Sequence, residues 1–226
     1  MEDPHVAAFV VEPIQGEAGV IVPDQGYLMR ASEICSNHNV LFVADEIQTG
    51  LGRTGRLLCC DYEKVRPDVL ILGKALSGGM YPVSAVLADD EVMLTIGPGE
   101  HGSTYGGNPL ACVIAIASLE VIENEDLSAN SLHMGDHFRN GLNTIQEENP
   151  LIREVRGKGL LNAIELEDDP ESTTAWDLCL RMMHHGLLAK PTHGNIIRFA
   201  PPLVIRKDEL DEGLEIIRTS IREIVK

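Results

Sequence analysis

The sequence predicts an α/β fold, with a mostly parallel sheet in residues 1–125 and a smaller α+β domain in residues 126–226. Two observations support this division. In the first part, short apolar runs rich in β-branched residues alternate with helical patterns, which is typical of parallel strands covered on both faces. In the second part, longer helical patterns are separated by strand-like segments. The 226 residues can bury the core of one large or two modest domains.

The first predicted strands are residues 6–12 and 40–46, which are apolar almost throughout. The segment between them carries apolar side chains at helical spacing, at Leu28, Ala31, Ile34 and Cys35. A strand, a helix and a second strand in this order form a right-handed βαβ unit by default. Residues 68–74 and 82–88 predict a third and a fourth strand.

A long helix is predicted next, with Asn108 as its cap and Pro109 at its first position. Residues 110–124 are apolar nearly all round, so we expect this helix to be buried. A helix with a single apolar face then continues to Pro150. Its apolar residues are Met134, Phe138, Leu142 and Ile145.

The remaining chain alternates strands and helices. Residues 155–166 are typical of strands, residues 176–185 of an amphipathic helix, and residues 196–205 of a pair of strands. Asp208 is expected to cap a last helix. The apolar residues of that helix are Leu210, Leu214, Ile217, Ile221 and Ile224.

Composition argues against several classes of function. A net charge of −17 without a basic patch disfavours nucleic acid and anionic membrane surfaces as partners. No apolar run reaches the roughly 18 residues that a membrane-spanning helix needs. The five cysteines form an odd set without CxxC spacing, which indicates a reducing compartment. His133 and His137 are four residues apart, but no ligand pattern completes a metal site, so none is expected.

Three successive predicted strands each end in an ionisable residue: Glu12, Asp45 and Lys74. In open α/β sheets, ligands bind outside the carboxyl ends of the strands. We expect Lys74 to be partly desolvated there, which lowers the pKa of an amine and makes it a nucleophile able to form a Schiff base. Lysine and aspartate at strand ends also form plain ion pairs, and a lone lysine often extends to water. A functional and a purely structural interpretation of these residues therefore both stay open.

A Schiff-base lysine and an aspartate that protonates a pyridine nitrogen are what a protein supplies to pyridoxal phosphate chemistry. In this reading Lys74 holds the cofactor, is displaced by the substrate amine and then transfers the proton. Asp45 keeps the ring able to accept electrons from a substrate carbanion. The sequence therefore favours pyridoxal 5′-phosphate as the cofactor.

Four segments also resemble the successive blocks of class III pyridoxal-phosphate aminotransferases: residues 10–20, 43–56, 72–87 and 101–111. Residues 72–87 and 186–205 are most similar to the members of this family that act on ornithine. The resemblance implies a pyridoxal-phosphate-dependent transferase of fold type I, of which residues 1–125 form part of the large domain. It also implies transfer of the δ-amino group of L-ornithine to 2-oxoglutarate, giving glutamate 5-semialdehyde and glutamate.

The same resemblance implies a role for individual residues. Lys74 matches the lysine that binds the cofactor, and Asp45 the partner of the pyridine nitrogen. Gln48 matches the residue near the phenolic oxygen of the cofactor. Ser103 and Thr104 match the pair that reaches the cofactor phosphate of the neighbouring subunit, which implies a homodimer or a higher homo-oligomer with shared sites.

Glu17 and Arg198 match a gating pair of the family. There the glutamate holds the arginine while ornithine reacts, and then releases it to bind the distal carboxylate of 2-oxoglutarate. The planar guanidinium fork suits a carboxylate better than an ammonium group does. The two residues lie far apart in the sequence and in different predicted domains, so their pairing must be tertiary.

The matching blocks start partway along the length of family members. We therefore expect this chain to lack the glycine-rich helix N-terminus for the phosphate, the aromatic residue stacked on the ring and the arginine for the substrate α-carboxylate. Made alone, it should fold poorly and have no useful transaminase activity. The expected location is the cytoplasm or the mitochondrial matrix, with no targeting region present in the chain.

Two alternative functions stay open. One is another class III enzyme, above all one that uses acetylornithine. The other is a catalytically silent chain that docks on a full-length subunit through the dimer face of the family.

Overall fold

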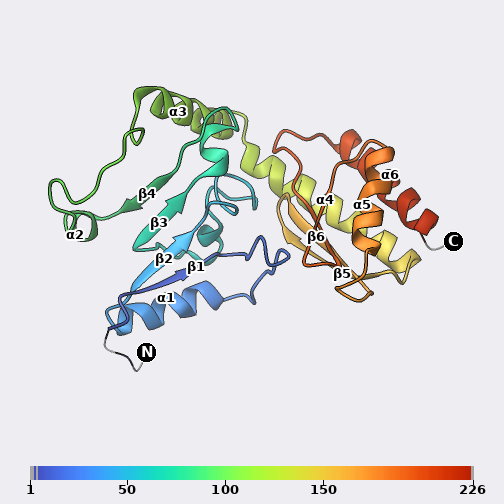
Figure 1. Ribbon diagram of the computed structural model, residues 1–226, viewed down its shortest axis with the longest axis horizontal. Coiled ribbons are helices and arrows are strands. Elements are labelled where there is room, and N and C mark those ends of the chain that lie inside the picture. The colour runs from blue at the N-terminus through green and yellow to red at the C-terminus, as the bar shows by residue number, and fades with distance from the viewer. Residues whose placement is uncertain (1–2, 4, 225–226) are drawn as a thin grey trace. The chain divides into compact units, whose positions relative to one another are not determined.

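The computed structural model describes residue 3 and residues 5–224, which form two compact units (Figure 1). Unit 1 consists of the described residues up to Pro13, with Pro23–Leu51 and Arg56–Asp126. Unit 2 consists of Ile14–Val22, Gly52–Gly55 and the described residues from Leu127 onward. Two short segments from the first half of the chain thus belong to the unit that is built mainly from the second half.

Unit 1 contains a four-stranded sheet in the order β1-β2-β3-β4 (Figure 1). The strands are β1 (Ala8–Val11), β2 (Leu41–Asp45), β3 (Val69–Leu72) and β4 (Ala85–Ala88). The first three are parallel and β4 is antiparallel to β3. Helix α1 (Tyr27–Asn37) joins β1 to β2, so the predicted βαβ unit and the α/β class are confirmed.

The core of unit 1 lies between one face of this sheet and α1. It combines residues of the sheet, the helix and the short helix η1 (Cys59–Glu63), namely Val11, Leu28, Cys35, Val40, Phe42, Ala44 and Cys60. On the opposite face, Val10 is 63% exposed and Val86 is 54% exposed. The expectation that both faces are covered is therefore wrong for these strands within the described residues.

Helix α3 (Pro109–Asn124) begins as predicted, because the Asn108 side chain accepts a hydrogen bond from the Ala111 N–H at 2.9 Å. The short helices η2 (Lys74–Ser77) and α2 (Asp90–Met93) precede it. The expected burial of α3 is not found. Only Ala111 and Ile122 of α3 are buried, and Val113 is 64% exposed. An apolar composition shows that burial of a helix would be favourable, but nothing in the described chain covers most of the apolar surface of α3.

Unit 2 is an α+β structure with a four-stranded antiparallel sheet in the order β5-β6-β8-β7. Its strands are β5 (Ile152–Lys158), β6 (Leu161–Leu166), β7 (Lys190–Thr192) and β8 (Ile196–Phe199). Its helices are α4 (Leu127–Glu148), α5 (Thr174–His184) and α6 (Lys207–Ile224). The sequence predicted each of these three helices, but it did not indicate β7.

The core of unit 2 is formed where these helices pack on the sheet. Phe138 of α4 and Phe199 of β8 meet edge to face, with ring centroids 5.5 Å apart. The apolar face of α6 is buried as its spacing predicts, through Leu210, Leu214, Ile217 and Ile221. Two details of the sequence-based prediction for unit 2 are wrong. Residues 200–205 form no second strand, since Pro201 and Pro202 interrupt the run, and Asp208 lies in the first turn of α6 rather than capping it.

No helix in the described part of the chain has both the length and the apolar character that crossing a membrane requires.

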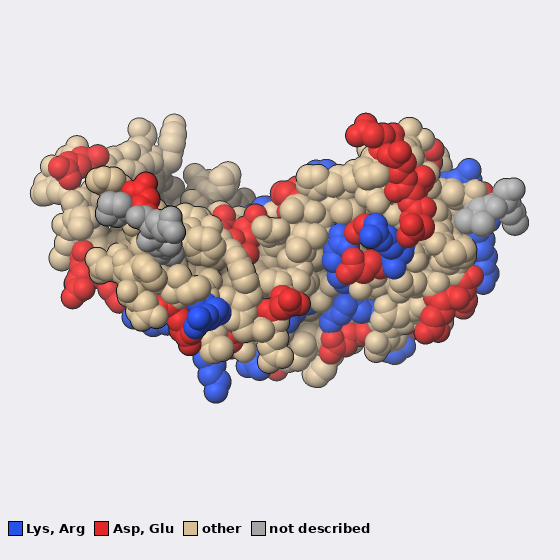
Figure 2. Space-filling model, turned by 90° about the horizontal axis from the view of Figure 1, so that it is seen from below, with Lys and Arg blue, Asp and Glu red and all other residues tan. Residues whose placement is uncertain are grey.

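The surface of unit 2 carries interleaved charges, seen as neighbouring blue and red atoms in Figure 2. Within unit 2, the mostly buried Arg156 pairs with both Glu154 and Glu165, each at 2.6 Å. The five cysteines, all within the described residues, are free thiols.

Candidate active site

The three ionisable residues that follow the predicted strands do share one edge of the sheet in unit 1. Strands β1, β2 and β3 are parallel neighbours, with Val11 opposite Ala44 and Asp45 opposite Ile71. Glu12, Asp45 and Lys74 therefore stand at or just beyond the carboxyl ends of adjacent strands. This is the edge at which open α/β sheets bind their ligands.

Asp45 is the last residue of β2 and is half-buried. Side chains alternate along a strand, so Asp45 faces away from the core that holds Phe42 and Ala44. Its Oδ1 accepts a hydrogen bond from the backbone N–H of Ile47 at 3.0 Å. This bond orients the carboxylate at the end of the strand.

Lys74 begins η2 two residues after the end of β3, and its side chain is exposed. The partial desolvation expected from the sequence is therefore not present in this chain. Its backbone φ is 43°, in the left-handed region that residues with a Cβ seldom adopt. Such conformations cost of order 1–3 kcal/mol and cluster at functional sites. Gly78 ends the same turn at φ 57°, where an added Cβ would lie 2.9 Å from Ser118 Oγ.

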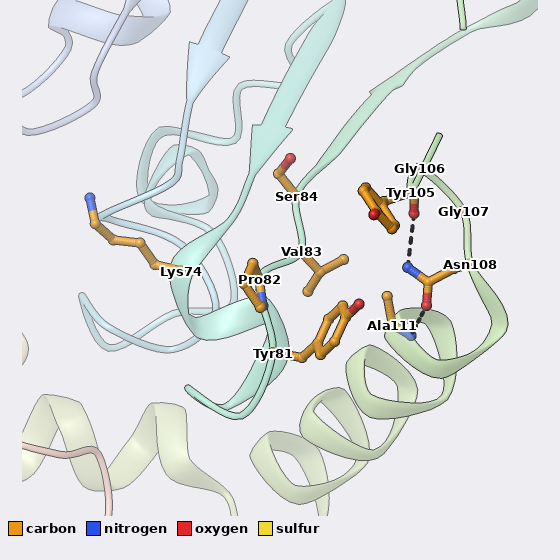
Figure 3. A pocket seen from close by; sticks show the side chains of 10 residues that line it. All are labelled: Lys74, Tyr81, Pro82, Val83, Ser84, Tyr105, Gly106, Gly107, Asn108 and Ala111. Atoms are coloured by element: carbon orange, nitrogen blue, oxygen red, sulfur yellow. Dashed lines mark hydrogen bonds between the residues drawn. The ribbon is translucent and has the colours of Figure 1, made fainter. Parts of the chain in front are cut away.

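A pocket of about 470 Å³ lies beside Lys74 in unit 1 (Figure 3). It is lined by Lys74, Tyr81, Pro82, Val83, Ser84, Tyr105, Gly106, Gly107, Asn108 and Ala111. The Lys74 amine extends away from the other labelled side chains (Figure 3), so the pocket contacts the base of this lysine and not its reactive nitrogen. Tyr81 and Tyr105 were not singled out from the sequence, because a lone tyrosine in a loop carries no motif.

The other predicted cofactor residues lie in loops of unit 1. Gln48 is half-buried in the turn after β2. Ser103 and Thr104 are exposed in the loop before α3. The Ser103 hydroxyl accepts a hydrogen bond from the Gly106 N–H at 2.9 Å, which shapes that loop.

Glu17 and Arg198 form the predicted tertiary pair, within unit 2. Arg198 Nη1 donates to Glu17 Oε1 at 2.7 Å. Arg198 lies on β8 with its side chain 18% exposed, whereas that of Glu17 is 59% exposed. The Thr192 hydroxyl on β7 donates to the Glu17 carbonyl at 2.7 Å and anchors the loop. The sequence showed no signal for Thr192, because β7 itself was not predicted.

Glu46, the neighbour of Asp45, is a buried acidic residue that was not singled out from the sequence. It directly follows Asp45 and is buried, with its carboxylate bonded to Thr49 and to the N–H of Cys60. The available signal was strand alternation, which turns two adjacent acidic residues to opposite faces of the sheet.

The profile of the family described as Aminotransferase class-III matches residues 1–221. The chain belongs to the class III aminotransferase family. The mixed α/β fold agrees with this membership, since the two similar solved structures reported below are aminotransferases.

Curated class III relatives include the mitochondrial ornithine aminotransferases of Drosophila melanogaster and Rattus norvegicus. They are 61% and 62% identical to this chain over 221 residues. Each match covers 98% of this chain and 50% of the relative. The chain thus spans about half the length of the curated relatives it matches.

Two solved structures are similar over nearly the whole chain. Acetylornithine aminotransferase from Elizabethkingia anophelis has a TM-score of 0.93 and 60% identity, covering 96% of this chain and 56% of its own. Ornithine aminotransferase from Toxoplasma gondii, which shows partial occupancy of PLP at its active site, has a TM-score of 0.95 and 48% identity. That match covers 99% of this chain and 52% of the other.

Proposed function

We propose that this chain is part of a pyridoxal-phosphate-dependent aminotransferase that moves the δ-amino group of L-ornithine to 2-oxoglutarate. The products are glutamate 5-semialdehyde and glutamate. The observation that carries the proposal is the placement of Asp45 and Lys74 at neighbouring parallel strand ends in a member of the class III family. The ornithine aminotransferases among its relatives favour ornithine as the donor.

The residues of this edge fit pyridoxal phosphate by their chemistry. Lys74 offers an exposed amine for the aldehyde, and the oriented Asp45 carboxylate can pair with a protonated pyridine nitrogen. When bound, the cofactor supplies an electron sink for the carbanion formed at the substrate. The strained backbone of Lys74 is typical of a residue whose position is set by function.

Each residue of the edge then has a defined task. Lys74 holds the cofactor and moves the proton at the substrate carbon. Asp45 keeps the proton on the pyridine nitrogen, because a carboxylate beside it favours the charged form. Gln48 would hold the phenolic oxygen of the cofactor. Ser103 and Thr104 would hold the phosphate of the cofactor bound in a neighbouring subunit, which would require a homodimer or a higher homo-oligomer.

Glu17 and Arg198 select the substrates. While they are paired, the arginine is neutralised and the site receives a donor without a second carboxylate, such as ornithine. When Arg198 is released, its guanidinium binds the distal carboxylate of 2-oxoglutarate. The 2.7 Å contact supports the closed form of this gate.

The same proposal includes the domains and the location. Residues 1–125 belong to the cofactor-binding domain, apart from Ile14–Val22 and Gly52–Gly55, which pack in unit 2, and residues 126–226 belong to the small domain. The fly and rat relatives are named mitochondrial, which supports the mitochondrial matrix, with the cytoplasm as the other candidate.

Acetylornithine is a second candidate donor, favoured by the 60% identity to the Elizabethkingia anophelis enzyme. The test is to load the full-length protein that contains this chain with pyridoxal phosphate and to supply 2-oxoglutarate with either donor at equal concentration; the kinetic tests below use the same full-length protein. Ornithine should give one glutamate per semialdehyde formed. Glutamate formation with acetylornithine and none with ornithine would replace the proposed donor.

A further inference from the structure

Glu46 carries a buried carboxylate directly beside the proposed ring partner Asp45. Its side chain is only 1% exposed. Its backbone N–H donates to the Ile71 carbonyl at 3.0 Å and so extends the parallel ladder by one residue. Alternation along the strand turns Glu46 to the face opposite that of Asp45, towards the core around Cys60. A buried charge is costly unless it is hydrogen-bonded, so its contacts define its role.

Both carboxylate oxygens of Glu46 accept hydrogen bonds. Oε1 accepts from the backbone N–H of Cys60 at 2.8 Å, and Oε2 accepts from the Thr49 hydroxyl. These donors are uncharged. Burial, and then the nearby Glu46 carboxylate, raise the pKa of the Cys60 thiol well above its usual range, so the thiol also stays neutral. Glu46 is thus held by hydrogen bonds that fix its geometry.

These bonds close the turn that carries Ile47 and Gln48. The Thr49 hydroxyl reaches back to the Glu46 side chain, and the Gly50 N–H donates to the Glu46 carbonyl at 2.9 Å. A Cβ added at Gly50 would lie 2.9 Å from that carbonyl oxygen, so the backbone approaches closely here. One side-chain bond and one backbone bond therefore define the turn from Glu46 to Gly50.

The orientation of Asp45 depends on this turn. The donor that holds Asp45 Oδ1 is the N–H of Ile47, which lies inside the turn. A loosened turn would displace this donor and would move Gln48 with it. Misplacement of a reacting group by about 1 Å can cost roughly 10²-fold in rate.

We propose that Glu46 is a positioning residue for the cofactor ring: its buried carboxylate clamps the turn of residues 46–50 so that Asp45 and Gln48 keep their places. This inference rests on the proposed function, in which those two residues face the cofactor. Glu46 acts through Asp45 and the turn, from the opposite face of the sheet.

The test compares Glu46→Gln and Thr49→Val with the control Glu33→Gln, an exposed residue of α1. In Glu46→Gln the amide oxygen can still accept from the Cys60 N–H and the new NH₂ group can donate to the Thr49 hydroxyl, so two charge-assisted hydrogen bonds become weaker neutral ones. Four properties are measured: the dissociation constant of pyridoxal phosphate, the pH midpoint of its visible band when bound, kcat and KM for ornithine, and thermal unfolding without cofactor.

Glu46→Gln should bind the cofactor roughly tenfold more weakly. Its visible band should titrate at a shifted pH, and kcat should fall while KM for ornithine stays close to the unsubstituted value. Thr49→Val should change the same properties in the same direction. Because both substitutions act on the same contact between residues 46 and 49, the double variant should be less affected than the product of the single effects.

The possible outcomes distinguish a failure of the proposed function from a failure of the positioning role of Glu46. If the unsubstituted protein does not hold pyridoxal phosphate on Lys74, the proposed function fails and this inference fails with it. If the cofactor is held there and both variants keep its affinity, band and kcat, the positioning role alone is overturned. If the variants lose only stability against unfolding, Glu46 serves folding alone, and this outcome also overturns the positioning role. Should Glu46→Gln not fold, Thr49→Val decides by the same criteria.

Discussion

Arg198 and Glu17, which are 181 positions apart in the sequence, form an ion pair with 2.7 Å between Nη1 and Oε1. The arginine is mostly buried on β8, while the glutamate stands on a loop and is more than half exposed. Such a pair can open without moving the sheet, because the exposed partner is the one on the loop. This is the property that a substrate gate requires.

Removal of the glutamate should remove the contact by which Glu17 holds Arg198. In Glu17→Ala we expect the preference for ornithine over α-amino donors to fall by about 1.5 kcal/mol, roughly tenfold. This is the lower end for a charged hydrogen bond, because Glu17 is exposed. The measurement is kcat/KM for ornithine and for glutamate as donors.

Glu154→Ala is the matched control, since Glu154 is similarly exposed and pairs with Arg156 on the same sheet. It should leave the donor preference unchanged. Equal preferences in Glu17→Ala and in the unsubstituted protein would count against the gate.

Asp45→Asn tests the charge at the end of β2. The amide oxygen can still accept from the Ile47 N–H, so the local geometry is kept while the negative charge is lost. Turnover should fall by at least roughly 10²-fold, because the pyridine nitrogen loses its proton. Asp68→Asn is the control, as Asp68 accepts from the Phe42 N–H at 2.7 Å in the same sheet. Turnover of Asp45→Asn equal to that of the control would contradict the assignment.

Gly135→Ala tests the packing of α4. A Cβ at Gly135 would overlap the carbonyl of Gly159 in the turn between β5 and β6, and backbone cannot give way as a side chain can. The free energy of unfolding should fall by about 1–3 kcal/mol or more. At Gly213 of α6 the Cβ would meet only the Leu187 side chain at 3.3 Å, so Gly213→Ala should be close to neutral. Denaturant titration of the two variants measures the difference.

Asp211 links α6 to α4 in a pH-dependent way. Its carboxylate accepts from Lys207 Nζ and from His137 Nε2, each at 2.6 Å, and these bonds, led by that of Lys207, lower the pKa of Asp211 below 3.8. Because the folded value is the lower one, the stabilisation is present above pH 3.8 and is lost as the pH falls through the folded pKa.

Asp211→Asn should therefore be less stable than the unsubstituted protein at neutral pH, and the two should converge as the pH falls through the folded pKa of Asp211. Lys207→Met should show the same pattern. Thermal unfolding between pH 2 and pH 7 measures both. A difference in stability that persists at the acid end would show that the pair does not act through the charge of Asp211.

The strand-end cluster could be predicted because contiguous apolar runs predict parallel strands, and parallel strands place their carboxyl ends at one edge. Asp45 and Lys74 were found this way from local pattern alone. The pair of Glu17 and Arg198 came from family resemblance, since no local pattern predicts a contact across 181 positions.

Other features depend on tertiary structure that local patterns do not encode. The sequence did not show that residues 14–22 pack with the second half of the chain, nor that Lys74 is exposed with a positive φ. The exposure of α3 was also not predicted, because the hydrophobicity of a helix shows that burial would be favourable but not whether another segment packs against it. Glu46 was overlooked because the burial of a carboxylate is decided by partners such as Cys60, which lies 14 positions away.

The most direct test of the proposed function is to identify the residue that holds the cofactor. The protein is loaded with pyridoxal phosphate, reduced with borohydride, digested and mapped by peptide mass. Lys74→Arg serves as the control that keeps the charge. We expect a pyridoxyl group on Lys74 in the unsubstituted protein and no specific label in Lys74→Arg. Label on Lys158 or Lys190 instead, or unchanged labelling in Lys74→Arg, would contradict it.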